Sequence, residues 1–153
     1  MVHLREMPEH LRDALVNQDV PTFDTSPWAD GPPLNERGVA LISSAGLHRR
    51  DDPPFTPGAG DYRIIPDDSE MDDLVMSHIS TNFDRTGYFQ DINVVFPIER
   101  LRELRDEGVI GSVAARHFSF MGATPPEQME PVARDLAGIL KQDNVDAVVF
   151  CPV

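Results

Sequence analysis

The stretch GVALISSAG, residues 38–46, predicts a β-strand in the interior of a sheet. It is a short apolar run that ends in small residues and a glycine, a composition typical of buried strands. A second continuous apolar run, DAVVFCPV, occupies residues 146–153. Strands without polar alternation are typical of parallel sheets, because both faces of such sheets are covered. The two runs therefore indicate parallel strands that are covered on both faces.

Between these runs, strand and helix patterns alternate. Further strands are predicted at YRIIP (62–66), at NVVF (93–96) and around residues 113–120. The segment MDDLVMSHI (71–79) fits either a strand or a helical turn, since apolar runs of this length are ambiguous. LHRRDDPPFTPGAGD (47–61) is rich in proline and glycine and predicts a long loop.

Two helices complete this alternation. In PIERLRELRDEG (97–108) the proline suits a first helical position and Gly108 ends the helix. The second helix lies within residues 123–144, with Thr124 as its candidate N-cap. Its predicted buried face consists of Met129, Val132, Leu136, Ile139 and Leu140. This order predicts an α/β fold, a mostly parallel sheet with flanking helices of the Rossmann- or flavodoxin-like type.

The first 36 residues differ in character from the rest of the chain. A short helix is predicted at residues 7–17, and an irregular proline-rich arm follows it. We expect Trp28 to anchor this arm against the body. Residues 1–36 are therefore predicted as a helix and arm, and residues 37–153 as the α/β domain, which we expect to be incomplete at its C-terminal end.

Charge and composition exclude several classes of protein. The chain has 153 residues and a formal net charge of -13, and an acidic surface repels the phosphates of nucleic acids. No stretch approaches the roughly 20 apolar residues that a membrane span needs, and the N-terminus lacks the apolar segment of a signal peptide. The single cysteine cannot form an internal disulfide. We therefore expect a cytoplasmic protein without nucleic-acid or membrane partners.

Polar residues follow the predicted strands, where ligands bind in open parallel sheets. They are Ser44, His48, Arg49, His78, Asn82, Asp84, His117 and Cys151. Arg49 with His48 suits an anionic substrate group. His78 and Asp84 suit proton transfer if they are hydrogen-bonded, and otherwise Asp84 caps a loop.

Other interpretations of these residues remain open. Cys151 fits an inert buried thiol as well as a reactive one, and His117 fits a position inside the sheet. The histidines lack the short spacing of zinc sites, so no metal is predicted.

Five segments resemble the selenoprotein B family of glycine, sarcosine, betaine and D-proline reductases. They are VALISSAGLHRRDDPPF, GDYRIIP, DLVMSHISTNFDRTGYFQDINVVFPIERLRELRDEGVIGSVA, FSFMGAT and VDAVVFCPV. The resemblance extends from Trp28 to the last residue. It implies reductive cleavage of a C–N bond in a small amino acid or amine.

The resemblance also implies a redox pair of cysteine and selenocysteine separated by two residues. Cys151 would be its cysteine, and the selenocysteine would follow Val153. We accordingly expect a short form that is cut at a UGA codon, and no other bound cofactor. On this basis Cys151, His78 and Asp84 are the expected catalytic residues. The expected substrate-binding residues are Ser44, His48, Arg49, Asn82 and His117.

The expected partners are a small amino acid or amine, a thiol or thioredoxin-type electron donor, and other reductase subunits; a homo-oligomer is compatible with this role. One alternative is a non-catalytic ligand-binding or assembly subunit that retains the fold and docks through a strand edge. A weaker one is a cysteine-based racemase-like enzyme, which normally needs two opposed acid–base groups where only one thiol is present.

Overall fold

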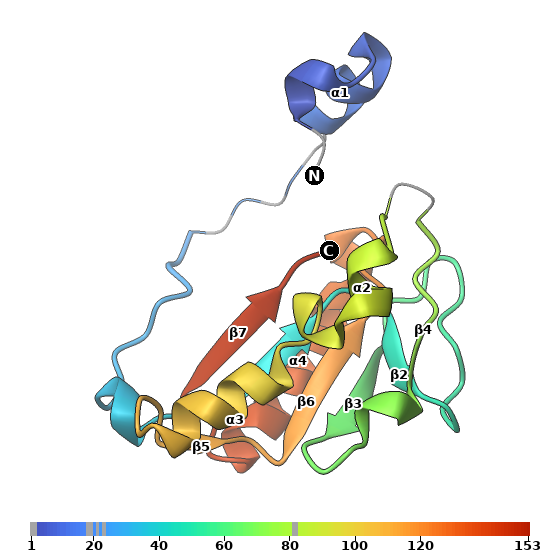
Figure 1. Cartoon of the computed structure of the whole chain (residues 1–153). Coiled ribbons are helices and arrows are strands. Elements are labelled where there is room, and N and C mark those ends of the chain that lie inside the picture. The colour runs from blue at the N-terminus through green and yellow to red at the C-terminus, as the bar shows by residue number, and fades with distance from the viewer. Residues whose placement is uncertain (1–2, 18–19, 21, 23, 81–82) are drawn as a thin grey trace.

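The computed structural model describes residues 3–17, 20, 22, 24–80 and 83–153. Its centre is a curled, mostly parallel sheet with helices on both faces (Figure 1). The strands of this sheet are β1 (Gly38–Ser43), β3 (Tyr62–Pro66), β5 (Ser112–Val113), β6 (Arg116–Phe120) and β7 (Ala147–Cys151). The mixed α/β class predicted from the sequence is confirmed, whereas the Rossmann- or flavodoxin-like assignment stays a prediction.

Strand β1 is the central strand of the sheet. Val39 pairs both with Ala147 of β7 and with Val113 of β5, so β5 and β7 lie along opposite edges of β1. Farther along β1, Ile42 pairs with Phe118 of β6. β5 and β6 therefore follow each other along one edge of β1, and β7 occupies the other. All three run parallel to β1, whereas β3 is antiparallel to β6.

The helix α4 (Pro126–Gln142) covers one face of the sheet. Alternate β1 residues point to opposite faces, and Ile42 packs with Phe118 and Leu136 on the α4 side. The apolar face predicted for this helix is confirmed, because its other members pack against the same cluster.

The opposite face carries a larger core. Leu41 packs there with Leu47 and Phe96, which come from the covering segments. These segments are β2 (Leu47–Arg49), η3 (Met71–Asp73), β4 (Leu74–Met76), α2 (Thr86–Gln90), η4 (Ile92–Val94) and α3 (Ile98–Asp106). β2 and β4 form a separate antiparallel pair. The helix predicted at 97–108 is confirmed as α3.

Several local predictions were wrong. Residues 93–96 are not a strand, because the Asp91 carboxylate accepts a hydrogen bond from the Asn93 amide and stabilises the short 3-10 helix η4. The segment 47–61 begins with strand β2 instead of being loop throughout. Thr124 does not cap α4: its hydroxyl donates to the carbonyl of Ala59, and Pro125 occupies the cap position.

Strand β7 is less covered than its apolar sequence predicts. Phe150 is 71% exposed and Val149 is 40% exposed, because β7 lies at the edge of the sheet beyond β1. The prediction that both faces of this strand are covered was therefore wrong, whereas every residue of β1 is buried, as predicted.

The N-terminal part projects away from the body (Figure 1). It contains η1 (Leu4–Glu6), α1 (Glu9–Val16) and η2 (Leu34–Glu36), so the predicted first helix is confirmed. Trp28 is 89% exposed and does not anchor the arm. The arm is held at its end instead, where the Arg37 guanidinium donates to the carbonyl of Pro32.

Among the described residues, none of the helices combines the length and the apolar character that crossing a bilayer requires.

Candidate functional site

The ends of β1, β6 and β7 meet at one border of the sheet, which we call the carboxyl edge. The Ser44 amide donates to the carbonyl of Cys151 at 3.1 Å, and the Val153 amide donates to the Ser44 hydroxyl at 2.9 Å. On the other side, the Gly46 amide donates to the carbonyl of Phe120 at 2.8 Å. The turn after β1 therefore joins the ends of both neighbouring strands, as the sequence predicts for Ser44 and Cys151.

Gly122 brings His78 to the carboxyl edge. Its φ of +82° lies in the left-handed region, and a Cβ at this position would lie 2.4 Å from the Ser44 carbonyl oxygen. The same Cβ would lie 3.2 Å from Nε2 of His78. Ser44, Gly122 and His78 therefore lie together. His78 reaches this position because it follows β4, on which Leu74 and Met76 point into the core and residues two apart share a face.

The imidazole of His78 is fixed in one protonation form. Its Nδ1 accepts a hydrogen bond from the Ser80 amide at 3.2 Å, so the neutral ring carries its proton on Nε2. Nε2 has no hydrogen-bond partner among the described residues. Burial, and then the charge of Arg85, lower the pKa of His78, so the ring is neutral near pH 7.

Asp84 does not form a pair with His78 in the described part of the chain. Its carboxylate accepts a hydrogen bond from the Thr86 amide at 2.9 Å. Hydrogen bonding by the Thr86 side chain, and then by this amide, lowers the pKa of Asp84. Of the two alternatives that the sequence allows, the structure shows the loop cap. Asn82, another predicted binding residue, lies outside the described residues.

The thiol of Cys151 faces the larger core. Its side chain is partly buried against that cluster, on the same face of the sheet as Leu41. Burial raises its pKa, so the thiol is protonated near neutral pH and is a poor nucleophile on its own. Cys151 of β7 and Ser119 of β6 both pair with Ser43 of β1, from opposite sides. Their backbones are therefore two strand spacings apart, which is roughly 10 Å.

His48 and Arg49 are directed away from the carboxyl edge. After the turn, β2 runs back along the sheet, so that exposed Arg49 lines a hollow of about 310 Å³ with Pro66 and Asp68. Pro66 pairs with Arg116, the first residue of β6, so this hollow lies at the opposite end of the sheet. His48 is buried beside Phe55, and its Nδ1–H donates to the carbonyl of Arg49 at 2.7 Å.

His117 lies within the sheet. It is fully buried, and its Nδ1 accepts a hydrogen bond from the Leu41 amide at 3.0 Å. Its Nε2 lies 3.7 Å from the carboxylate of Asp67, which also pairs with Arg102. Burial lowers the pKa of His117 to about 4, against the opposing effect of Asp67. This is the interior position that the sequence left open, and a ligand-binding role for His117 stays a prediction.

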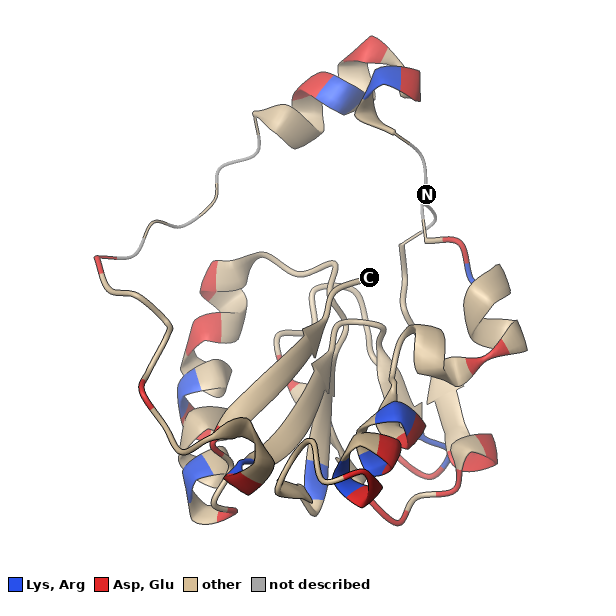
Figure 2. Ribbon diagram, turned by 60° about the vertical axis from the view of Figure 1, so that its left-hand side comes forward, with Lys and Arg blue, Asp and Glu red and all other residues tan. Residues whose placement is uncertain are grey.

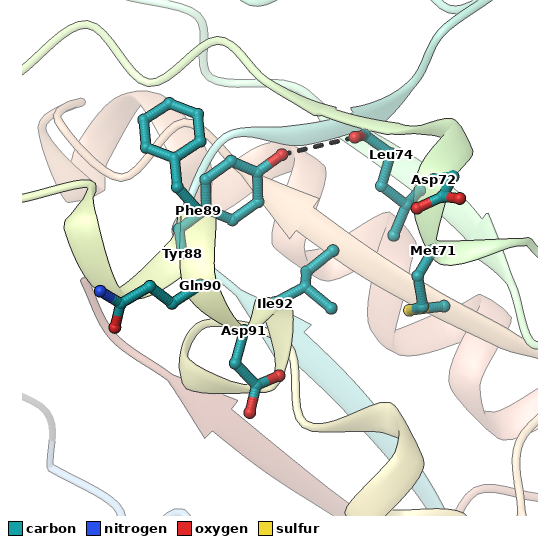
Figure 3. A pocket seen from close by; sticks show the side chains of 8 residues that line it. All are labelled: Met71, Asp72, Leu74, Tyr88, Phe89, Gln90, Asp91 and Ile92. Carbon is teal, nitrogen blue, oxygen red and sulfur yellow. Dashed lines mark hydrogen bonds between the residues drawn. The ribbon is translucent and has the colours of Figure 1, made fainter.

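A separate pocket of about 330 Å³ lies between α2, η4 and η3 (Figure 3). The Tyr88 hydroxyl donates to the carbonyl of Leu74 across it at 3.4 Å. None of the predicted site residues that the structure describes lines this pocket.

Two residues of the carboxyl edge were missed by the sequence-based assignment of site residues. Gly122 stands directly after a predicted strand, where a glycine often marks a close approach, and it was noticed there but not assigned as a site residue. Arg85 carries no such signal, because only the fold brings it next to His78. Among the described residues, no group of three or more His, Cys, Asp or Glu side chains is arranged as metal ligands would be.

The fold and the carboxyl edge define an α/β protein whose candidate ligand site lies at the ends of parallel strands. The family described as glycine/sarcosine/betaine reductase selenoprotein B (GRDB) matches residues 16–152. The chain belongs to this family, as its resemblance to the selenoprotein B reductases predicted.

Curated relatives carry the names of reductase subunits. The chain is 36% identical over 121 residues to D-proline reductase subunit gamma of Acetoanaerobium sticklandii. The aligned region covers 76% of the chain and 49% of that protein. The chain is also 30% identical over 143 residues to glycine reductase complex component B subunit gamma of Symbiobacterium thermophilum, covering 86% of the chain and 32% of that protein. The chain thus spans half or less of the length of these relatives. No solved structure matches it significantly.

Proposed function

We propose that this chain is a selenoprotein B-like reductase subunit that takes part in the reductive cleavage of a C–N bond in a small amino acid or amine. Glycine, sarcosine, betaine and D-proline are the substrates that the names of its relatives suggest. The observation that carries the proposal is the position of Cys151, whose backbone is bonded to Ser44 at the carboxyl edge in a chain of this family.

Cys151 is proposed as the resolving thiol of a redox pair whose selenocysteine follows Val153. Selenium there would supply a nucleophile that is ionised at neutral pH. The residues present fit such a partner, because the raised pKa of the Cys151 thiol makes it unsuited to be the first nucleophile. The selenol would supply the attacking nucleophile. Cys151 would be the thiol that gives up its proton and pairs with it when two electrons pass to the substrate and the amine leaves, and an external dithiol would then restore both groups in their reduced form.

The carboxyl edge suits a small zwitterionic substrate. The turn residues that border it, Ser44 to Gly46 and Met121 to Pro125, are uncharged, and Figure 2 shows most of the charged residues of the body on the helices and at the other end of the sheet. Substrate charges therefore meet few competing ion pairs there. The proposed partners are other reductase subunits and a thioredoxin-type dithiol.

The experiment is reconstitution of the chain, extended through the selenocysteine proposed to follow Val153, with the other subunits of a D-proline or glycine reductase. Amine or reduced product from isotope-labelled substrate is then measured, and the chain without that selenocysteine is expected to be inactive. We expect dithiol-dependent turnover that Cys151→Ser abolishes and that the exposed control Trp28→Ala leaves unchanged. Full turnover of Cys151→Ser would contradict the proposal. Sequencing of the message beyond codon 153 tests the redox pair separately, and a UAA or UAG codon directly after Val153 would contradict it.

A second candidate is a non-catalytic assembly subunit, and the exposed edge strand β7 favours it. Phe150 is 71% exposed on a strand that pairs only with β1 among the described residues, and such edges bind other strands. This candidate predicts that Phe150→Glu prevents association with the partner subunits while Cys151→Ser has no effect on turnover.

A further inference from the structure

The strongest unexplained feature of the carboxyl edge is the Nε2–H group of His78. The His78 side chain is more than nine-tenths buried, at 6% exposure, and Nε2 has no hydrogen-bond partner among the described residues. Buried polar groups are nearly always hydrogen-bonded. An unpartnered donor at the predicted ligand edge therefore indicates that its acceptor is a group from outside the chain.

The ring is held so that Nε2 keeps its proton and its direction. The Ser80 amide donates to Nδ1 at 3.2 Å, and the ring of Phe83 packs edge-on against the imidazole at 5.1 Å between centroids. The Arg85 guanidinium donates to the carbonyl of His78 at 2.5 Å. These contacts make His78 a preorganised donor rather than a general base, because the lone pair of Nδ1 is already engaged and Asp84 is bonded elsewhere.

Arg85 adds positive charge beside this donor. Its guanidinium donates to the carbonyls of His78, Ser80 and Phe83. Carbonyl oxygens leave its charge uncompensated, and no carboxylate of the described residues forms an ion pair with it. Arg85 lies close enough for its charge to lower the pKa of His78, and a cation near a fixed N–H donor favours an anionic oxygen ligand. The neighbouring residues Ser44 and Gly122 bring no negative charge.

We propose that His78 and Arg85 form the subsite for the carboxylate of the amino-acid substrate, with His78 Nε2–H donating to one carboxylate oxygen. This deepens the proposed function and rests on it for the identity of the substrate. Nε2 is enclosed next to Gly122, so binding of a carboxylate requires the turn at Gly122 and the imidazole to move apart. His78 is a positioning residue in this scheme, since it orients the substrate and does not touch the bond that breaks.

The test is a calorimetric titration of the whole chain with glycine, sarcosine, betaine and D-proline. Each is compared with its counterpart that lacks the carboxylate: methylamine, dimethylamine, tetramethylammonium and pyrrolidine. We expect at least one amino acid to bind roughly tenfold or more tightly than its counterpart, the size of a charge-assisted hydrogen bond. Equal affinity within every pair, or no binding of any amino acid, would overturn the proposal.

Two variants of His78 separate the two ring nitrogens. His78→Asn can still accept from Ser80 but lacks the distal donor, and we expect it to lose about tenfold in affinity. His78→Gln carries an amide N–H near the position of Nε2, and we expect it to recover part of this loss. Equal affinity of His78→Asn and the unaltered chain would contradict the proposal, and thermal unfolding of both variants shows whether each is folded.

Arg85→Gln tests the charge, with Arg50→Gln as a matched control. Arg50 also donates to a backbone carbonyl, that of Asp72, but lies away from the carboxyl edge. We expect Arg85→Gln alone to weaken binding of the amino acid. ¹⁵N spectra of the imidazole give a readout that does not depend on binding, and they should show a protonated Nε2 and an unprotonated Nδ1 in His78; the opposite tautomer would overturn the assignment.

The two proposals fail in different ways. If the reconstituted complex forms no amine while amino acids still bind in a His78-dependent manner, the reductase function fails and the carboxylate subsite stands. If turnover and affinity are unchanged in His78→Asn and Arg85→Gln, the subsite fails and the reductase function stands.

Discussion

At the scale of single residues, the carboxyl edge depends on close approaches that only particular side chains permit. Gly122 combines a φ of +82° with backbone contact to Ser44 and side-chain contact to His78. Ser44 in turn bonds to Cys151 and Val153. A change at Gly122 therefore disturbs the positions of His78 and the end of β7 together.

Gly122→Ala is expected to destabilise the chain by about 2–4 kcal/mol, because the added Cβ meets the Ser44 carbonyl and the backbone conformation is strained. Urea unfolding measures this loss. Gly58→Ala is the matched control: its φ is +76°, but nothing lies within 4 Å of the added Cβ, so only the strain of about 1 kcal/mol remains. Equal losses in both variants would contradict the contact at Gly122.

His117 is expected to make stability depend on pH. Its pKa is about 4 in the folded chain and about 6.5 when unfolded, so below pH 6.5 the unfolded chain binds a proton that the folded chain does not. The contribution of His117 to the free energy of unfolding is thus fully present above about pH 6.5, decreases as the pH drops toward 4, and stays constant below that.

Between pH 6.5 and pH 4, His117 lowers the free energy of unfolding by about 3 kcal/mol in total. The lowered pKa of His78 acts in the same direction. Asp67 and Arg102 face the His117 ring and oppose each other, since Asp67 raises its pKa and Arg102 lowers it. His117→Asn, which can still accept from the Leu41 amide, should flatten the pH dependence of urea unfolding between pH 4 and 6.5. An unchanged slope in this variant would show that His117 is not the group responsible.

At the scale of elements, helix α4 covers its face of the sheet through one buried side chain in particular. Leu136 is 3% exposed and packs with Ile42 and Phe118. Leu136→Ala should cost about 2–5 kcal/mol in urea unfolding, since a cavity remains in the core. Leu15→Ala in α1, where Leu15 is 51% exposed, should change stability by less than about 0.5 kcal/mol. If Leu136→Ala lost as little stability as Leu15→Ala, this packing of α4 would be contradicted.

The elements that the sequence predicts well are those with strong local patterns. The apolar run at 38–43 and the helices α3 and α4 are recognisable because their periodicity and end signals agree. Short elements were missed for physical reasons: β2 has only three residues, and η4 depends on the side chain of Asp91. The exposure of β7 depends on the order of the strands, which periodicity does not determine.

The same distinction applies to the candidate site. Ser44, His78 and Cys151 were predicted from their positions at strand ends, and the structure brings the neighbourhoods of all three to the carboxyl edge. Arg49 was assigned to this edge because the reversal of the chain at β2 is invisible in the sequence. Arg85 became a candidate only when its bonds to the carbonyls around His78 were known.

At the scale of the whole molecule, charge and apolar surface are unevenly distributed. The net charge is -13, yet the turns of the carboxyl edge carry almost none of it (Figure 2). The exposed Phe150 on β7 lies next to Cys151, so the proposed redox thiol and the strand edge that suits a partner subunit are adjacent. This arrangement is what a subunit needs if it passes electrons within a complex.

The central claim is that the carboxyl edge binds the amino acid next to Cys151, and the rate of alkylation of this single thiol by iodoacetamide tests it most directly. Because burial raises the pKa of Cys151, we expect slow alkylation near pH 7 that accelerates as the pH rises above 9. A saturating concentration of the bound amino acid should slow the reaction several-fold, whereas its counterpart without a carboxylate should not. An alkylation rate that is the same with and without every amino acid would contradict the account.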